Sequence, residues 1–123
     1  MMHPNGLPDF EAEVRFIPNE EGSLPERKAG WRTDISYFED APKCAVWFVW
    51  PVEWIVDGEY LNKGDLIPHV ALAQFAIVMN ESRPIHQERI KIGVQFRIVQ
   101  GWRTVALARV TKILHLNDHA ETP

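Results

Sequence analysis

Two segments rich in apolar and β-branched residues flank the dipeptide Gln100-Gly101 near the C-terminal end of the chain. Glycine accepts the positive φ angle of a tight turn without a steric clash at Cβ. A glycine-containing dipeptide between two such segments therefore predicts a β-hairpin. We expect this hairpin to complete a sheet to which the rest of the chain contributes further strands.

Several other segments carry the signature of strands, in which successive side chains point to opposite faces. The expected strands cover residues 10–17, 31–38, 44–50, 66–79, 90–98 and 102–116. The run 66–79 alternates poorly, and a helix is the alternative there. Asp57-Gly58 predicts a small additional hairpin over residues 54–61. In the last strand Val105 and Val110 fall on opposite faces, which indicates a β-bulge.

The strand tally favours an all-β sandwich or barrel with about six main strands and no amphipathic helix. Nine prolines and seven glycines in 123 residues also favour many turns. A barrel removes exposed sheet edges, which suits a small all-β domain. We expect one domain over residues 10–116, with tails at 1–9 and 117–123.

Composition limits the classes of function. The net charge of −4 disfavours strong non-specific binding to nucleic acid and leaves a local basic patch open. The longest apolar run, residues 44–52, is too short to cross a bilayer, so we expect no membrane span. One cysteine, Cys44, rules out an intrachain disulfide. With no signal-peptide pattern at the N-terminus, a cytoplasmic location is expected.

A set of short fragments, in order over about residues 10–115, resembles the C-terminal domain of translation elongation factor Tu. The fragments are Phe10–Phe16, Glu20-Glu21-Gly22, Gly30-Trp31-Arg32, Gly64-Asp65, Phe96–Val105 and Val110–Leu114. The resemblance implies a closed six-stranded antiparallel β-barrel. In that family the barrel contacts the stem of aminoacyl-tRNA and packs on a GTPase domain.

The chain departs from the family in ways that bear on function. It has no glycine-rich phosphate loop, and the pattern Asn62-Lys63-Gly64-Asp65 falls where the family has a turn, so no GTP binding is expected. Val99 replaces a basic residue that the family uses to contact RNA. The resemblance thus implies that the barrel frame is kept and that the RNA contacts are reduced.

Three tryptophans, Trp47, Trp50 and Trp54, form the first candidate site. Strict alternation places Trp47 on the face opposite to Trp50, so at least one ring is expected to face outward. Exposed tryptophan commonly anchors a protein partner or stacks on a base. A tryptophan-rich core beneath a long loop is an equally good interpretation.

The second candidate site follows from the resemblance to the tRNA-contacting domain. Its residues are Arg27, Lys28, Arg32, Gln100, Gly101 and Arg103. RNA binding would require the basic members, together with Arg97, to gather on one face.

No cofactor, metal or catalytic constellation is expected. His115 and His119 are four residues apart, but zinc needs further ligands and none is near in the sequence. His69 and His86 are isolated and are expected to be structural or surface groups. We therefore expect a non-enzymatic binding module, with a protein partner or self-association favoured and RNA as the alternative.

Overall fold

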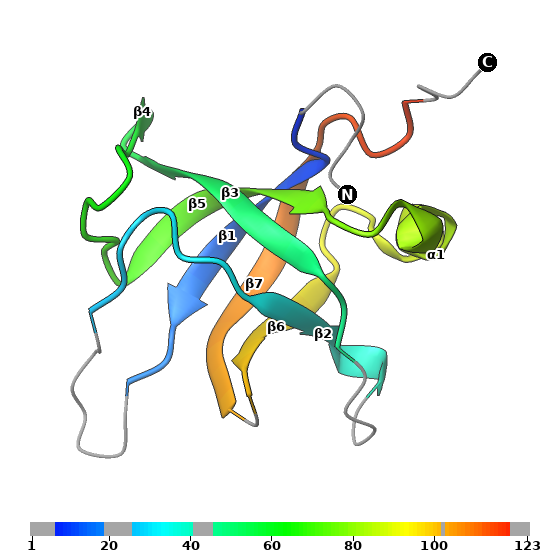
Figure 1. Cartoon of the computed structure of the whole chain (residues 1–123), viewed down its shortest axis with the longest axis horizontal. Coiled ribbons are helices and arrows are strands. Elements are labelled where there is room, and N and C mark those ends of the chain that lie inside the picture. Colours follow the sequence, from blue (N-terminus) through cyan, green and yellow to red (C-terminus); the bar gives the residue numbers. More distant parts are fainter. Residues whose placement is uncertain (1–6, 19–25, 41–45, 102, 119–123) are drawn as a thin grey trace.

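The structure, a computed structural model, describes residues 7–18, 26–40, 46–101 and 103–118. The fold is mostly β, a seven-stranded antiparallel sheet in the order β2-β6-β7-β1-β5-β3-β4 with one short helix (Figure 1). The strands are β1 (Phe10–Phe16), β2 (Asp34–Tyr37), β3 (Val49–Val56), β4 (Glu59–Tyr60), β5 (Val70–Ile77), β6 (Gln95–Gln100) and β7 (Arg103–Ile113). The helix is α1 (Arg83–Arg89), and 3-10 turns cover Phe38–Asp40 and Asn80–Ser82.

The first strand, β1, is the centre of the sheet, where it pairs with β5 on one side and β7 on the other. Its alternation is the reason for this place. Phe10, Ala12, Val14 and Phe16 are buried, while Arg15 on the opposite face is exposed. The predicted strand 10–17 is therefore confirmed, and its apolar face lies at the middle of the core.

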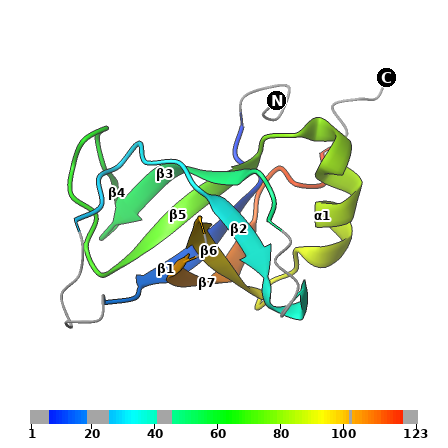
Figure 2. The ribbon, with the colours of Figure 1, turned by 60° about the horizontal axis from the view of Figure 1, so that its bottom comes forward.

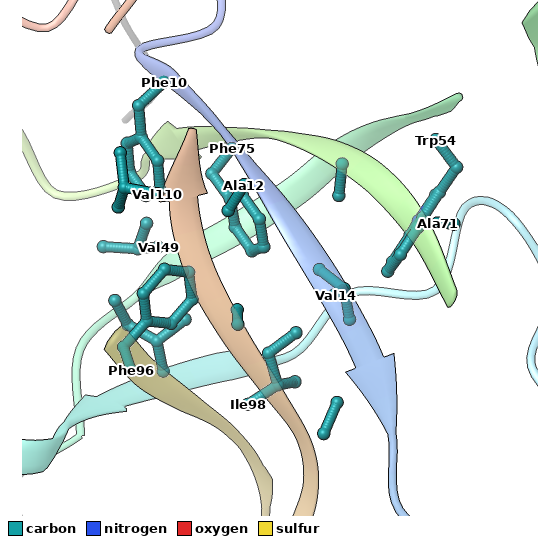
Figure 3. Close-up of a cluster of buried hydrophobic side chains, with 14 of the residues drawn as sticks. Phe10, Ala12, Val14, Val49, Trp54, Ala71, Phe75, Phe96, Ile98 and Val110 are labelled. Carbon is teal, nitrogen blue, oxygen red and sulfur yellow. The ribbon is translucent and has the colours of Figure 1, made fainter. Parts of the chain in front are cut away.

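Aromatic rings fill the core between the strands (Figure 3). Phe10 stacks on Phe75 with ring centroids 5.2 Å apart, and Phe96 meets both rings edge-on. Such pairs contribute beyond the area they bury, because the ring edge is positive and the ring face negative. These contacts connect β6 to β1 and β5, although β6 is not next to either strand in the sheet.

The predicted closed six-stranded barrel is wrong, because the sheet is not closed into a barrel. Within the described residues, one isolated bridge joins Ile35 of β2 to Trp47, in the segment that precedes β3. Closure would need a ladder along this seam, but β2 has four residues and β3 begins only at Val49. The residues expected to start the third strand, 41–45, lie outside the described ranges. Figure 2 shows β2 on this side of the molecule, where the sheet is not closed.

The predicted end of the third strand at Pro51 is also wrong, because β3 runs through Pro51 to Val56. Proline is tolerated there since the pairing with β5 shifts between Pro51 and Glu53, which is a β-bulge. Asp57 and Gly58 have φ angles of 53° and 81° and connect β3 to β4, so the predicted Asp57-Gly58 hairpin is confirmed.

The last strand carries the predicted bulge. Pairing with β6 shifts between Ile98 and Val99, and pairing with β1 shifts between Glu11 and Ala12. As a result the neighbours Val105 and Ala106 are both buried, and Val110 is buried as well, while Leu107 is 41% exposed. The turn is displaced from its expected place, because Gln100 pairs with Arg103 and only Gly101 of the predicted dipeptide lies in it.

The sequence predicted no amphipathic helix, and the structure adds one short helix, α1, which follows β5 at one end of the sheet (Figures 1 and 2). Pro84 occupies the first helical turn, where proline is tolerated. Arg83 ties the helix to the sheet through a salt bridge of 2.7 Å to Asp9, which is fully buried although it lies in the expected N-terminal tail. The segment predicted as strand from Ile90 onward becomes β6 only at Gln95.

Candidate functional site

A pocket opens between the segment that leads into β2 and the β3–β4 hairpin. Its volume is about 260 Å³, and its lining residues are Ala29, Gly30, Arg32, Val52, Glu53, Trp54, Leu61 and Lys63. The segment is held by backbone hydrogen bonds of 2.8 Å from Ala29 to Asp65 and from Gly64 to Ala29. These bonds join two loops that are far apart in the sequence, and Figure 1 shows them side by side near β4.

Arg32 is oriented by an aromatic ring. Its guanidinium lies over the Trp50 ring, 5.6 Å from the centroid. The ring is itself fixed, because Trp50 Nε1 donates a 3.0 Å hydrogen bond to an Asp34 carboxylate oxygen. A cation over a tryptophan face is attracted by the ring quadrupole while its edge N–H groups stay free to donate. Arg32 therefore presents donors at the pocket without depending on a carboxylate partner.

Lys63 is oriented by the backbone of Gly30. Gly30 has a φ angle of 100°, and a Cβ added there would lie 3.0 Å from Lys63 Cγ. The lysine stem thus runs along a surface that only glycine leaves open. The turn that carries Lys63 is closed by Asp65, whose carboxylate accepts a 2.7 Å hydrogen bond from the Asn62 N–H.

The charges of the pocket are unbalanced. Within the described ranges, neither Arg32 nor Lys63 lies within ion-pair distance of a carboxylate. Glu53 lines the same pocket and is exposed, while the half-buried Val52 and Leu61 supply an apolar part of a lining that is mostly polar. Two cations against one anion leave a net positive charge beside an apolar surface.

The three predicted tryptophans do not form one exposed site. Trp54 is 1% exposed and packs on Phe16 with ring centroids 5.7 Å apart, so it belongs to the core. Trp47 is half-buried and meets the His86 ring edge-on at 5.0 Å. Trp50 is half-buried beneath Arg32. Trp54 therefore agrees with the alternative of a tryptophan-rich core, and the most exposed ring of this segment is that of Phe48, at 47%.

The exposed apolar residues lie where β3 begins. Val46 and Phe48, on either side of Trp47, are 45% and 47% exposed. Because Trp47 points inward, its two neighbours point out, and Trp50 and Val52 continue this outer face toward the pocket. We call Val46, Phe48, Trp50 and Val52 the β3 stripe. Phe48 lies beside β5, since its carbonyl accepts a 2.9 Å hydrogen bond from the Val78 N–H.

The residues expected to contact RNA form two groups, which the structure brings to the same end of the sheet. Arg27, Lys28 and Arg32 lie before β2, and Gln100, Gly101 and Arg103 lie at the β6–β7 turn. The groups are connected by a 2.5 Å hydrogen bond from Thr33 Oγ1 to the Val99 carbonyl. Arg97 does not join them, because it packs over the Phe38 ring at 4.2 Å.

A buried polar cluster beneath α1 is absent from the sequence-based sites. His86 is fully buried, with Nδ1 2.6 Å from the Tyr37 hydroxyl and Nε2 without a hydrogen-bond partner. Burial, assisted by the Arg89 and Arg83 guanidinium groups and opposed by Asp9, lowers the pKa of His86 from 6.5 to about 4. The ring is therefore neutral at pH 7, and the expectation of a structural histidine is confirmed.

The described residues contain no group of three or more His, Cys, Asp or Glu side chains that could hold a metal ion. His115 forms a 2.8 Å contact with Asp118, and His119 lies outside the described ranges. None of the helices described is long and apolar enough to span a membrane.

No protein-family model matches the sequence, and no curated protein matches it. The arrangement of side chains therefore has to carry any functional argument.

Proposed function

We propose that this protein is a non-enzymatic binding module that recognises another protein through the β3 stripe. The observation that carries the proposal is the exposure of Val46 and Phe48, at 45% and 47%, on the segment that leads into β3. Backbone hydrogen bonds hold this segment, between Trp47 and Ile35 and from the Val78 N–H to the Phe48 carbonyl. Aromatic and aliphatic side chains on a backbone held in this way lose little entropy when a partner covers them. They are therefore suited to anchor an interface.

The surroundings of the stripe support the same proposal. Val78 lies beside Phe48 and is half-buried, and the next residue, Met79, is 41% exposed. This extends the apolar surface from β3 to the end of β5. The resemblance to the C-terminal domain of elongation factor Tu belongs to the proposal as well, because in that family the domain works by packing on another surface.

The test is capture of partners by the tagged full-length chain from a lysate of its native host, with ribonuclease added to one half. We expect a ribonuclease-resistant protein partner that is retained by Ile92→Ser and lost with Phe48→Ser. Ile92 is 69% exposed and lies outside the stripe, so it is the matched control. A partner captured equally by both variants would contradict the proposal. A second copy of the chain as the partner would appear as a larger sedimentation coefficient that Phe48→Ser abolishes.

RNA binding is the second candidate, and one observation favours it. Arg27, Lys28 and Arg32 share an end of the sheet with Arg103, whereas Arg97, which the tRNA-contacting alternative also requires, packs over Phe38. Arg27 and Arg32 each lie over a tryptophan ring, at 5.2 and 5.6 Å. RNA recovered from the untreated lysate, with binding that weakens steeply as salt rises, would favour this candidate over a protein partner.

A further inference from the structure

We propose that the pocket between Gly30 and the β3–β4 hairpin binds a carboxylate group of the protein partner through Arg32 and Lys63. This inference rests on the proposed function and deepens it, because the pocket lies at the end of the β3 stripe. Val52 belongs to both. A partner segment that covers Phe48 and continues along β3 reaches the pocket without leaving the sheet.

The size of the pocket decides what kind of ligand fits. Pockets that hold whole small molecules typically have volumes of about 300–1,000 Å³. The volume here is about 260 Å³, which suits one side chain or one chain terminus rather than a complete cofactor. The pocket is therefore suited to read part of a larger ligand.

The charges decide which group is read. Arg32 and Lys63 come from different loops, both are oriented by packing, and neither has a carboxylate partner in the part of the chain that the structure describes. A guanidinium and an ammonium placed together are a suitable receptor for an oxyanion. Glu53 on the same wall removes one unit of positive charge and so disfavours a doubly charged phosphate.

The walls distinguish a carboxylate from the phosphodiester of RNA, which carries the same single charge. Val52 and Leu61, both half-buried, offer apolar contact, and a carboxylate in a protein is attached to a hydrocarbon stem. A backbone phosphate brings no such stem. Burial of the stem against these walls adds hydrophobic stabilisation that RNA cannot obtain here.

The experiment is a titration of the isotope-labelled full chain followed by NMR. The probes are N-acetyl-glutamate amide, its glutamine analogue and the dinucleotide UpU, which contains one phosphodiester, each at millimolar concentration. We expect saturable shifts at Gly30 and Lys63 with the glutamate probe, and at least tenfold weaker binding of the other two. Arg32→Gln and Lys63→Met should each weaken glutamate binding about tenfold, as expected for loss of a charged hydrogen bond. Arg103→Gln, a cation outside the pocket, should leave it unchanged.

Equal shifts with the glutamine probe, or no saturable shift, would overturn the inference. Preference for the dinucleotide UpU would overturn it too and would favour the RNA candidate for this pocket. These failures are separable from failure of the proposed function. If Lys63→Met retains a captured partner that Phe48→Ser loses, the stripe is an interface and the carboxylate inference is wrong.

Discussion

The hydroxyl of Tyr37 lies 2.6 Å from Nδ1 of His86, and both residues are fully buried. The pair connects β2, the strand at the open edge of the sheet, to the helix α1. The edge-on contact of Trp47 with the same imidazole adds the segment that precedes β3. One histidine thus connects α1, β2 and the segment before β3, which border the side where the sheet is not closed.

Stability should fall as pH falls from about 6.5 to about 4. The pKa of His86 is lowered by burial to about 4, so the unfolded chain binds more protons than the folded one in this window. Protonation therefore favours unfolding, by at most about 3 kcal/mol over the window. Urea denaturation at a series of pH values measures this slope. His86→Gln lacks the titrating group and should show a shallower slope above pH 5, and parallel slopes for both proteins would contradict the assignment.

Breaking the salt bridge between Arg83 and Asp9 should be costly. Asp9 has a fully buried side chain, which also accepts a 2.8 Å hydrogen bond from the Ile77 N–H. Arg83→Met leaves this carboxylate without its cation, and we expect a loss of about 3–5 kcal/mol in unfolding free energy at pH 7. Arg103→Met, at an exposed arginine, should change it by less than about 0.5 kcal/mol. Similar losses in both variants would show that the burial of Asp9 has no energetic consequence.

The tryptophans should differ in how much stability they supply. Trp54 is buried in the core, so Trp54→Ala should lower the unfolding free energy by about 3–5 kcal/mol. Trp54→Phe should cost less, since Nε1 of Trp54 has no hydrogen-bond partner to lose. Trp50→Phe removes the bond to Asp34 and should cost about 1 kcal/mol. Chemical denaturation ranks the three variants, and a cost of Trp50→Phe above that of Trp54→Ala would contradict this placement.

Two glycines allow the pocket to be tested separately from backbone strain. Gly30 and Gly64 have φ angles of 100° and 94°, so alanine at either position should destabilise the fold by about 1–2 kcal/mol. Only at Gly30 would the new Cβ displace Lys63, because nothing lies within 4 Å at Gly64. Gly30→Ala should therefore weaken binding of the glutamate probe, whereas Gly64→Ala should leave it intact. Equal binding by both variants would show that the position of Lys63 is immaterial.

Local periodicity predicted the strands well where packing agrees with it. Phe10–Phe16 forms a strand with every second residue buried, as its alternation requires. The segment Arg83–Arg89 could not be read in this way, because seven residues hold too few turns to show helical periodicity, and Pro84 suggested a loop. The continuation of β3 through Pro51 depends on a bulge, which the sequence does not announce.

The pocket was largely invisible in the sequence for a related reason. Lys63 and Gly30 are brought together by hydrogen bonds between two loops, and no spacing rule connects them. The glycine at position 30 was a partial indication, because glycine is the residue that adopts the positive φ angle found there. For His86 the sequence left a structural and a surface role open, because an isolated histidine between Ile85 and Gln87 is compatible with either. Both features arise from long-range packing, which local patterns do not encode.

The bulge in β3 adds one residue to this strand without changing which face the flanking side chains point to. Pro51 and Glu53 pair with consecutive residues of β5, Phe75 and Gln74, so Val52 is the one residue without a place in the ladder. Removal of Val52 would leave every cross-strand partner unchanged, and no side chain would move from the buried to the exposed face of the sheet. Deletion of this one residue would therefore reshape a wall of the pocket while the buried face of the strand stays the same. The recognition surface can thus change at this position independently of the core.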